Sequence, residues 1–158
     1  MALRFGAVVF GAVAVMAVAG AGMTLAWAQA GGEQVVKERS DLMRAMNENN
    51  KIVAAVAKGG AIDAKVVKAA EDMAASAQKI PSLFPAGTGD DKLRTRAKPA
   101  IWQNWAKFEA TAKDAATSFA AVAVAAKAGD KAGVEAGFTK GNQACTACHK
   151  EARGPALK

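Results

Sequence analysis

The residues of this chain that could do chemistry are concentrated in one pentapeptide near its C-terminus, Cys145-Thr146-Ala147-Cys148-His149. Two thiols three positions apart lie on neighbouring faces of one helical turn, so both sulfurs can reach the two vinyl groups along one side of a porphyrin. The imidazole that follows is placed to ligate the iron from the proximal side. A C-x-x-C-H run of this kind is typical of covalent haem c attachment, with thioethers at Cys145 and Cys148 and His149 as axial ligand.

Three other interpretations of the thiol pair were considered. A zinc site takes four ligands, whereas Cys145, Cys148 and His149 are the only cysteines and the only histidine in the chain. A thioredoxin-like redox pair is expected beside a βαβ pattern, and the sequence shows no strand pattern. A short structural disulfide is the alternative that spacing alone leaves open. Haem attachment is the interpretation that uses all three residues.

The first thirty residues have the pattern of a secretory signal peptide. Arg4 precedes an uncharged stretch from Phe5 to Ala28, and Ala28-Gln29-Ala30 forms an A-x-A cleavage site. A retained membrane anchor is the alternative, because the stretch approaches the roughly 20 apolar residues of a bilayer span. We expect residues 1–30 to be removed and residues 31–158 to form one domain without a membrane span. The expected location is the periplasm, where c-type haem is attached and conditions are oxidising.

The composition limits the function further. The net charge is +7, which favours redox partners with acidic surfaces. The basic residues are scattered singly rather than interleaved with aromatic residues, so nucleic acid is not an expected partner. The chain has no tyrosine, no second histidine and no paired carboxylates suited to acid–base catalysis. We therefore expect that the protein is not an enzyme.

The mature part is rich in Ala, Lys and Val and predicts an all-α domain. Asp63 is a suitable N-cap, Gly59-Gly60 suits a helix end, and Pro99 suits a first helical position. Residues 81–97 contain two prolines and two glycines and predict a long loop. Four helices are predicted, at residues 33–58, 63–80, 99–127 and 131–153.

Apolar residues in these segments follow 4-3 spacing, as in an antiparallel four-helix bundle. In the second segment they are Val66, Ala70, Met73, Ala77 and Ile80. In the third they are Ile101, Trp105, Phe108, Ala112, Ala115, Phe119 and Val122. In the fourth they are Val134, Phe138, Gly141, Cys145 and Cys148. The haem would therefore lie inside the bundle, near the C-terminus, where it fills volume that the small seam residues leave. We expect the apo-protein to be much less stable than the holo-protein.

Taken together, these features resemble the class II c-type cytochromes, the cytochrome c′ family. The marks are the C-x-x-C-H run near the C-terminus, the four predicted helices and the segment Arg39-Ser40-Asp41-Leu42-Met43. Two further segments, Leu83-Phe84-Pro85-Ala86-Gly87-Thr88 and Ala97-Lys98-Pro99-Ala100-Ile101-Trp102, are also similar to segments of that family. The resemblance covers essentially the whole mature chain.

The resemblance implies a left-twisted antiparallel bundle with His149 as proximal ligand, often as a homodimer through the first two helices. It also implies one of two iron sites. In one, a methionine of the first helix is the sixth ligand and the protein is a low-spin electron carrier. In the other, the iron is five-coordinate and high-spin, an apolar residue shields its distal face, and the haem binds NO or CO.

Met43, four residues after Arg39, falls where the low-spin family members have their ligand. A thioether is a suitable axial ligand and raises the redox potential, although methionine in a helix is usually a core gap-filler. Met46 is a second candidate, one turn further on. The resemblance implies that Arg39 pairs with a haem propionate, with a solvated side chain as the alternative; Arg96 is another propionate candidate. We predict an electron carrier with His149 and Met43 as ligands, and gas binding as the alternative.

Overall fold

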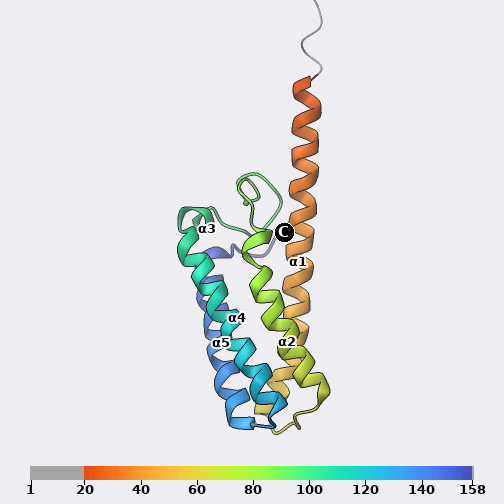
Figure 1. The fold of residues 1–158 in the computed structure, drawn as a ribbon. Helices are drawn as coiled ribbons and strands as arrows, with labels where there is room; N and C mark the ends of the chain where they lie inside the picture. Colours follow the sequence, from red (N-terminus) through yellow and green to blue (C-terminus); the bar gives the residue numbers. More distant parts are fainter. Residues whose placement is uncertain (1–19, 158) are drawn as a thin grey trace, which may run out of the picture.

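A computed structural model describes residues 20–157, and the described part is an all-α bundle of long helices (Figure 1). The elements are α1 Gly20–Ala57, α2 Ala64–Lys79, the short 3-10 helix η1 Pro81–Leu83, α3 Ala100–Gln103, α4 Trp105–Lys127 and α5 Lys131–Ala152. Figure 1 shows α1, α2, α4 and α5 running alternately down and up. The predicted antiparallel four-helix bundle is therefore confirmed.

The two ends of the bundle are built differently (Figure 1). The turn end holds the short connections 58–63 and 128–130, at the bottom of Figure 1. The loop end holds residues 80–99, α3 and the C-terminal end of α5. The pentapeptide with the two cysteines lies in the last turns of α5, so the candidate site belongs to the loop end.

Short polar caps fix the turn end. The Asp63 carboxylate accepts hydrogen bonds from the amides of Lys65 (2.9 Å) and Val66 (3.1 Å), as its predicted N-cap role requires. Asp130 accepts from the Gly133 amide at 3.0 Å and begins α5. Gly59 has φ +97°, a left-handed conformation that glycine adopts without a Cβ penalty, just after α1 ends.

Three predicted helix boundaries were wrong. The predicted third helix is broken at Asn104, which has φ −126° and ψ 46° and separates α3 from α4. Asparagine side chains offer local hydrogen bonds that compete with the helical backbone, and the Asn104 carbonyl accepts the Phe108 amide that starts α4. Pro99 caps α3 rather than beginning it. The first helix extends further toward the N-terminus than residue 33: α1 spans Gly20–Ala57, and Gly20 is the first described residue.

The predicted signal peptide, residues 1–30, lies mostly outside the described residues. Only the helical backbone of residues 20–30 is described in that segment. Within residues 20–157, none of the helices combines the length and the apolar character that crossing a membrane requires.

The largest fully buried side chains lie in the middle of the bundle and toward the turn end. They are Val53, Val56, Met73, Phe119, Val122 and Val134. Helix α5 approaches α4 closely through glycines: a Cβ on Gly141 would lie 2.5 Å from the Phe119 ring, and one on Gly137 would lie 2.9 Å from a Val122 methyl. Gly141 therefore occupies the seam position predicted for it, because only a residue without a side chain fits beside Phe119.

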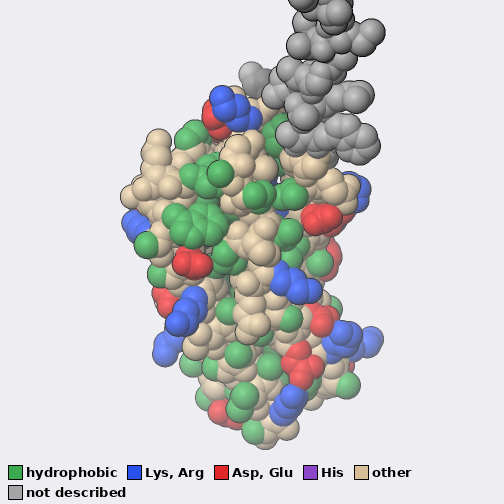
Figure 2. All heavy atoms as spheres, turned by 45° about the horizontal axis from the view of Figure 1, so that its top comes forward, with side chains coloured by type: hydrophobic (Ala, Val, Ile, Leu, Met, Phe, Trp, Pro, Cys, Tyr) green, Lys and Arg blue, Asp and Glu red, His purple; other side chains and the backbone are tan. Residues whose placement is uncertain are grey.

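The loop end is held by polar contacts of its own. The Trp102 indole donates a hydrogen bond to the Phe84 carbonyl at 2.9 Å. An isolated β-bridge pairs Ala97 with Arg153, just after α5 ends. Figure 2, in which this end comes forward, shows hydrophobic side chains gathered among the backbone and charges of both signs around them. The long connection is thus fastened to the helix that carries the cysteines.

Candidate haem site

Helix α5 places Cys145, Cys148 and His149 within two successive turns. Both cysteines are free thiols, half-buried against the core. Burial raises the pKa of Cys145, and it raises the pKa of Cys148 to about 11, with the nearby charges of Cys145 and Glu151 as lesser causes. Burial thus favours the protonated thiol at both positions, and both side chains pack against the hydrophobic core without being fully buried in it.

The His149 side chain lies on the exposed side of α5. Its pKa is lowered, first because the surrounding protein displaces water and then because of the positive charges of Arg153 and Arg96. Imidazole binds iron through a ring nitrogen that carries no proton. The lowered pKa thus favours the form of His149 that can serve as an axial ligand.

The two methionine candidates lie on α1 at the height of the cysteines. The Asn50 side-chain amide donates to the Asn142 side-chain carbonyl at 2.7 Å, which joins α1 to α5. Cys145 is three residues above Asn142 on α5, and Met46 is four residues above Asn50 on α1, so helical rise brings them to the same level. Met46 is buried, whereas Met43, nearly one turn nearer the loop end, is half-buried against the core.

Arg39 is a buried cation, only 5% exposed. Its Nη2 donates to the Thr88 carbonyl (3.0 Å) and to the Thr95 hydroxyl (3.1 Å). Its guanidinium carbon lies 4.3 Å from the centre of the Phe84 ring. Nη1 is buried and has no hydrogen-bond partner, and burial lowers the pKa of the side chain.

This environment is incomplete for a charged group. A buried cation without an anion, and with one donor unpaired, costs several kcal/mol by order of magnitude. A carboxylate that accepts from Nη1 would remove both costs, and a haem propionate is such a group. The Arg39 site therefore fits a haem, and the alternative of a solvated Arg39 side chain is wrong.

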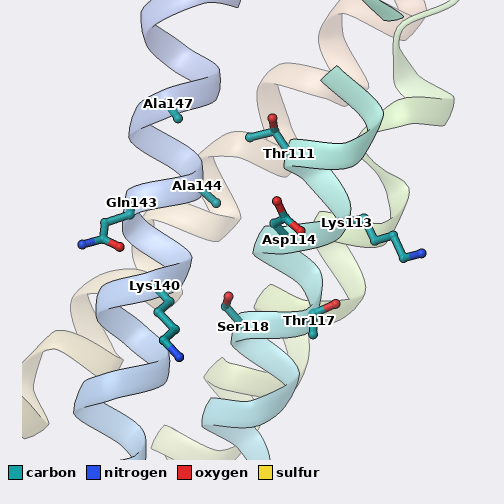
Figure 3. Close-up of a pocket in the computed structure, with 9 residues that line it drawn as sticks. All are labelled: Thr111, Lys113, Asp114, Thr117, Ser118, Lys140, Gln143, Ala144 and Ala147. Atoms are coloured by element: carbon teal, nitrogen blue, oxygen red, sulfur yellow. The ribbon is translucent and has the colours of Figure 1, made fainter. Parts of the chain in front are cut away.

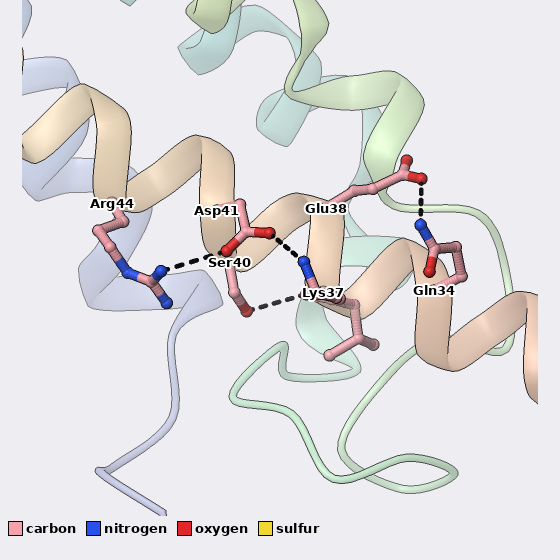
Figure 4. Close-up of polar contacts among 7 residues, drawn as sticks. Gln34, Lys37, Glu38, Ser40, Asp41 and Arg44 are labelled. Carbon is pink, nitrogen blue, oxygen red and sulfur yellow. Dashed lines mark hydrogen bonds and ion pairs between the residues drawn. The ribbon is translucent and has the colours of Figure 1, made fainter.

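The carboxylates of the same helix are engaged elsewhere, on its exposed face (Figure 4). Asp41 pairs with Lys37 at 2.7 Å and with Arg44 at 3.3 Å. Glu38 accepts a hydrogen bond from the Gln34 amide at 2.9 Å. None of these acids contacts Arg39 on the buried side, so α1 supplies the cation without its counter-ion.

Arg96 lies close to His149, but the contacts found for its side chain are with the protein backbone rather than with a predicted propionate. Its Nε donates to the Gly154 carbonyl at 2.8 Å, and its own carbonyl accepts the Gly154 amide at 2.7 Å. At least one guanidinium nitrogen of Arg96 therefore holds the segment after α5. A propionate contact of Arg96 stays a prediction.

Three residues around Arg39 were not predicted from the sequence: Phe84, Thr88 and Thr95. They belong to the long connection, where threonines are ordinarily exposed, yet both threonines are buried here. No spacing in the sequence relates them to Arg39, about fifty residues earlier. The one available signal was the segment 83–88, which contains Phe84 and Thr88 and resembles a segment of the cytochrome c′ family.

Two hollows border α5. An open groove between α4 and α5 is lined mainly by polar side chains such as Thr111, Asp114 and Lys140 (Figure 3). It lies away from Arg39 and Met43. A small cavity of about 40 Å³ is lined by Cys148, Phe108 and residues of α3. The haem-attachment helix is thus less completely covered near Cys148 than beside Gly141.

A four-helix bundle with a C-x-x-C-H run on its last helix defines a class II c-type cytochrome. The profile of the cytochrome c′ family matches residues 34–153, and the chain belongs to that family. Its members carry one covalently bound haem c.

Two related sequences and one solved structure support this family assignment. Cytochrome c′ of Rhodopseudomonas palustris is 38% identical over 127 residues, which cover 75% of this chain and 81% of that protein. Cytochrome c-556 of Agrobacterium tumefaciens is 34% identical over 120 residues, covering 75% and 95%. The crystal structure of cytochrome c′ from Thermochromatium tepidum is similar with a TM-score of 0.71 at 30% identity, covering 78% of this chain and 97% of that one.

Proposed function

We propose that this cytochrome is a periplasmic electron carrier with one haem c attached through Cys145 and Cys148. His149 is the proximal iron ligand and Met43 the distal one. Arg39 holds a propionate. The haem supplies one-electron chemistry when bound, and the axial ligands and the surrounding charges tune its potential. The observation that carries the proposal is the position of Met43 on α1. Met43 is half-buried, four residues after the incompletely paired Arg39, and lies seven residues above Asn50, as His149 lies seven residues above Asn142.

A second candidate function is gas binding at a five-coordinate iron. Met43 packs against the hydrophobic core, and an apolar side chain that shields the distal face would be packed in the same way. In this case Met43 covers the iron without ligating it, and NO or CO takes the sixth position. Neither function requires enzymatic turnover, in keeping with the absence of paired catalytic carboxylates in the sequence.

The cellular setting follows from the chain's charge and its N-terminus. A signal peptide at residues 1–30 would deliver the chain to the periplasm, where haem c is attached. The net charge is +7 for the full sequence and +6 once residues 1–30, with Arg4, are removed. This charge suits redox partners with acidic surfaces, which it would attract by electrostatic steering. Family membership favours a homodimer through α1 and α2.

The absorption spectrum of the holo-protein separates the two functions. A methionine ligand gives low-spin bands with a sulfur-to-iron charge-transfer band. Met43→Ala should abolish that band, and Met46→Ala, which removes the neighbouring methionine, should leave it. A high-spin spectrum that Met43→Ala does not change would overturn the carrier proposal and leave the gas-binding one.

The covalent link has a separate test. Thioethers at both cysteines keep the haem on the polypeptide during acid–acetone extraction, and Cys145→Ser with Cys148→Ser should release it. Haem that is extracted from the unmodified protein would contradict the proposed attachment.

A further inference from the structure

The buried hydroxyl of Thr95 joins Arg39 on α1 to the long connection, which is itself paired with the end of α5. Thr95 Oγ1 accepts hydrogen bonds from Arg39 Nη2 at 3.1 Å and from the Ala97 amide at 3.3 Å. Thr95 is 8% exposed, so water does not readily replace either donor. One oxygen atom thus connects the guanidinium on α1 to the backbone of the long connection.

From Ala97 the contacts continue to the helix that carries His149. Ala97 forms the β-bridge with Arg153, and Arg96 exchanges two hydrogen bonds with Gly154, at 2.7 and 2.8 Å. The Arg153 amide in turn donates to the His149 carbonyl at 3.1 Å. An unbroken series of hydrogen bonds and chain segments therefore runs from the proximal ligand on α5 to Arg39 on α1.

We propose that Thr95 is a positioning residue of the haem site, whose hydroxyl fixes the Arg39 guanidinium relative to the end of α5. Nη2 is held by Thr95 and by the Thr88 carbonyl, so the direction of the unpaired Nη1 is set by these two acceptors. A guanidinium is a rigid plane, and fixing one nitrogen fixes the other. The inference rests on the proposed role of Arg39 toward a propionate.

The chain offers a matched control for this role. Thr88 is a second buried threonine in the same connection, 4% exposed. Its hydroxyl donates to the Pro85 carbonyl at 2.8 Å, and it contacts Arg39 only through its backbone carbonyl. Thr88→Val keeps that carbonyl, whereas Thr95→Val removes the acceptor that Arg39 uses. Both substitutions replace a hydroxyl with a methyl group of similar size.

The experiment compares holo-proteins by midpoint potential and by the resonance Raman bands of the propionates. Thr95→Val should shift both in the same direction as Arg39→Gln, by a smaller amount. Thr88→Val, which keeps the carbonyl that Arg39 uses, should shift both less than Thr95→Val does. Thr95→Ser, which keeps the hydroxyl, should have the midpoint potential and Raman bands of the parent protein. In an Arg39→Gln background, Thr95→Val should cause no further shift, because its effect passes through Arg39.

Two outcomes would overturn the role of Thr95 while leaving that of Arg39 intact. One is that Thr95→Val leaves the potential and the Raman bands unchanged while Arg39→Gln shifts them; the propionate role of Arg39 would then stand without Thr95. The other is an equal shift from Thr95→Val with and without Arg39. If Arg39→Gln itself shifts neither quantity, the underlying propionate role fails as well. If Thr95→Val does not fold, a parent-like Thr95→Ser supports the inference and a shifted one contradicts it.

Discussion

The two halves of the bundle differ in how completely the protein's own side chains fill the core. Toward the turn end the core closes on its own side chains: Phe119 and Val122 are completely buried, and α5 presents glycines to α4 at these positions. Toward the loop end, Met43, Cys145 and Cys148 are only half-buried. In the first half, large side chains of the protein itself fill the core. We propose that the haem completes the second half when it is bound.

Polar groups show the same difference. At the turn end, Asp63 and Asp130 satisfy helix amides with good geometry. At the loop end, the described residues include a buried Arg39 nitrogen without a partner. Native proteins seldom leave such groups unpaired, so an unpaired one marks a place where something else binds. This difference supports the proposal that the loop end receives the haem, while the turn end carries stability.

The largest effect that we predict is at Phe119. Phe119→Ala removes a fully buried ring and should lower the free energy of unfolding by roughly 3–5 kcal/mol. The loss should be similar in the holo-protein and in a Cys145→Ser, Cys148→Ser variant without haem, because the turn end does not depend on the cofactor. Urea unfolding measures both. A loss of unfolding free energy in the holo-protein alone would show that the turn end also depends on the cofactor.

Gly141 tests the close approach of α4 and α5. Gly141→Val would place a Cβ 2.5 Å from the Phe119 ring, and overpacking of this kind costs roughly 1–3 kcal/mol. Ala136→Val, at an exposed position of the same helix, is the control for the β-branched side chain and should change little. Thermal unfolding compares the two variants. Equal changes in melting temperature would mean that the Phe119 ring can move aside and that α4 and α5 are not closely packed there.

Arg39 tests the loop end. In the holo-protein, Arg39→Met should lower the free energy of unfolding by about 1.5–3 kcal/mol more than in the haem-free variant, because a hydrogen bond to a charged group is lost only there. Without haem, the same change removes a buried charge that lacks an anion and should be close to neutral. Denaturant unfolding of the four proteins gives the difference. Equal losses in both forms would argue against a propionate partner.

The smallest effect is expected on the exposed face of α1, at the pairs in Figure 4. Hydrogen bonding to Lys37, together with the charges of Lys37 and Arg44, lowers the pKa of Asp41 below 3.8. The pairs therefore contribute above about pH 3.8, and the contribution is lost as pH falls through the lowered pKa. Asp41→Asn should barely change the melting temperature at pH 7 and should abolish this small acid dependence. A large loss at pH 7 would mean that this face matters more than exposed ion pairs normally do.

Much of the architecture could be predicted because it depends on local patterns. Three such features depend on residues only a few positions apart. They are the seam spacing through Phe119 and Gly141, the Asp63 cap and the C-x-x-C-H run. The break at Asn104 was not predicted, because a single asparagine inside an apolar pattern is compatible with a continuous helix. Its backbone conformation depends on tertiary contacts at the start of α4.

Spacing alone predicts the site only where its residues are adjacent in sequence, whereas Arg39 and Met43 were predicted through the family resemblance. Cys145, Cys148 and His149 lie within five positions, so spacing alone relates them. Arg39 meets Thr88 and Thr95 through a long connection whose path is set by pairing with the end of α5. Contacts of this kind are determined by the whole fold, and no periodicity in the sequence encodes them.

Hydrogen exchange of backbone amides tests the central claim most directly, namely that haem completes the loop end of a core that is otherwise closed. The holo-protein would be compared with the Cys145→Ser, Cys148→Ser variant, segment by segment. We predict that removing the haem strongly lowers protection in residues 39–46, 84–97 and 145–153, and lowers it little in residues 53–73 and 119–134. Equal loss of protection in both halves, or no loss at the loop end, would contradict the account.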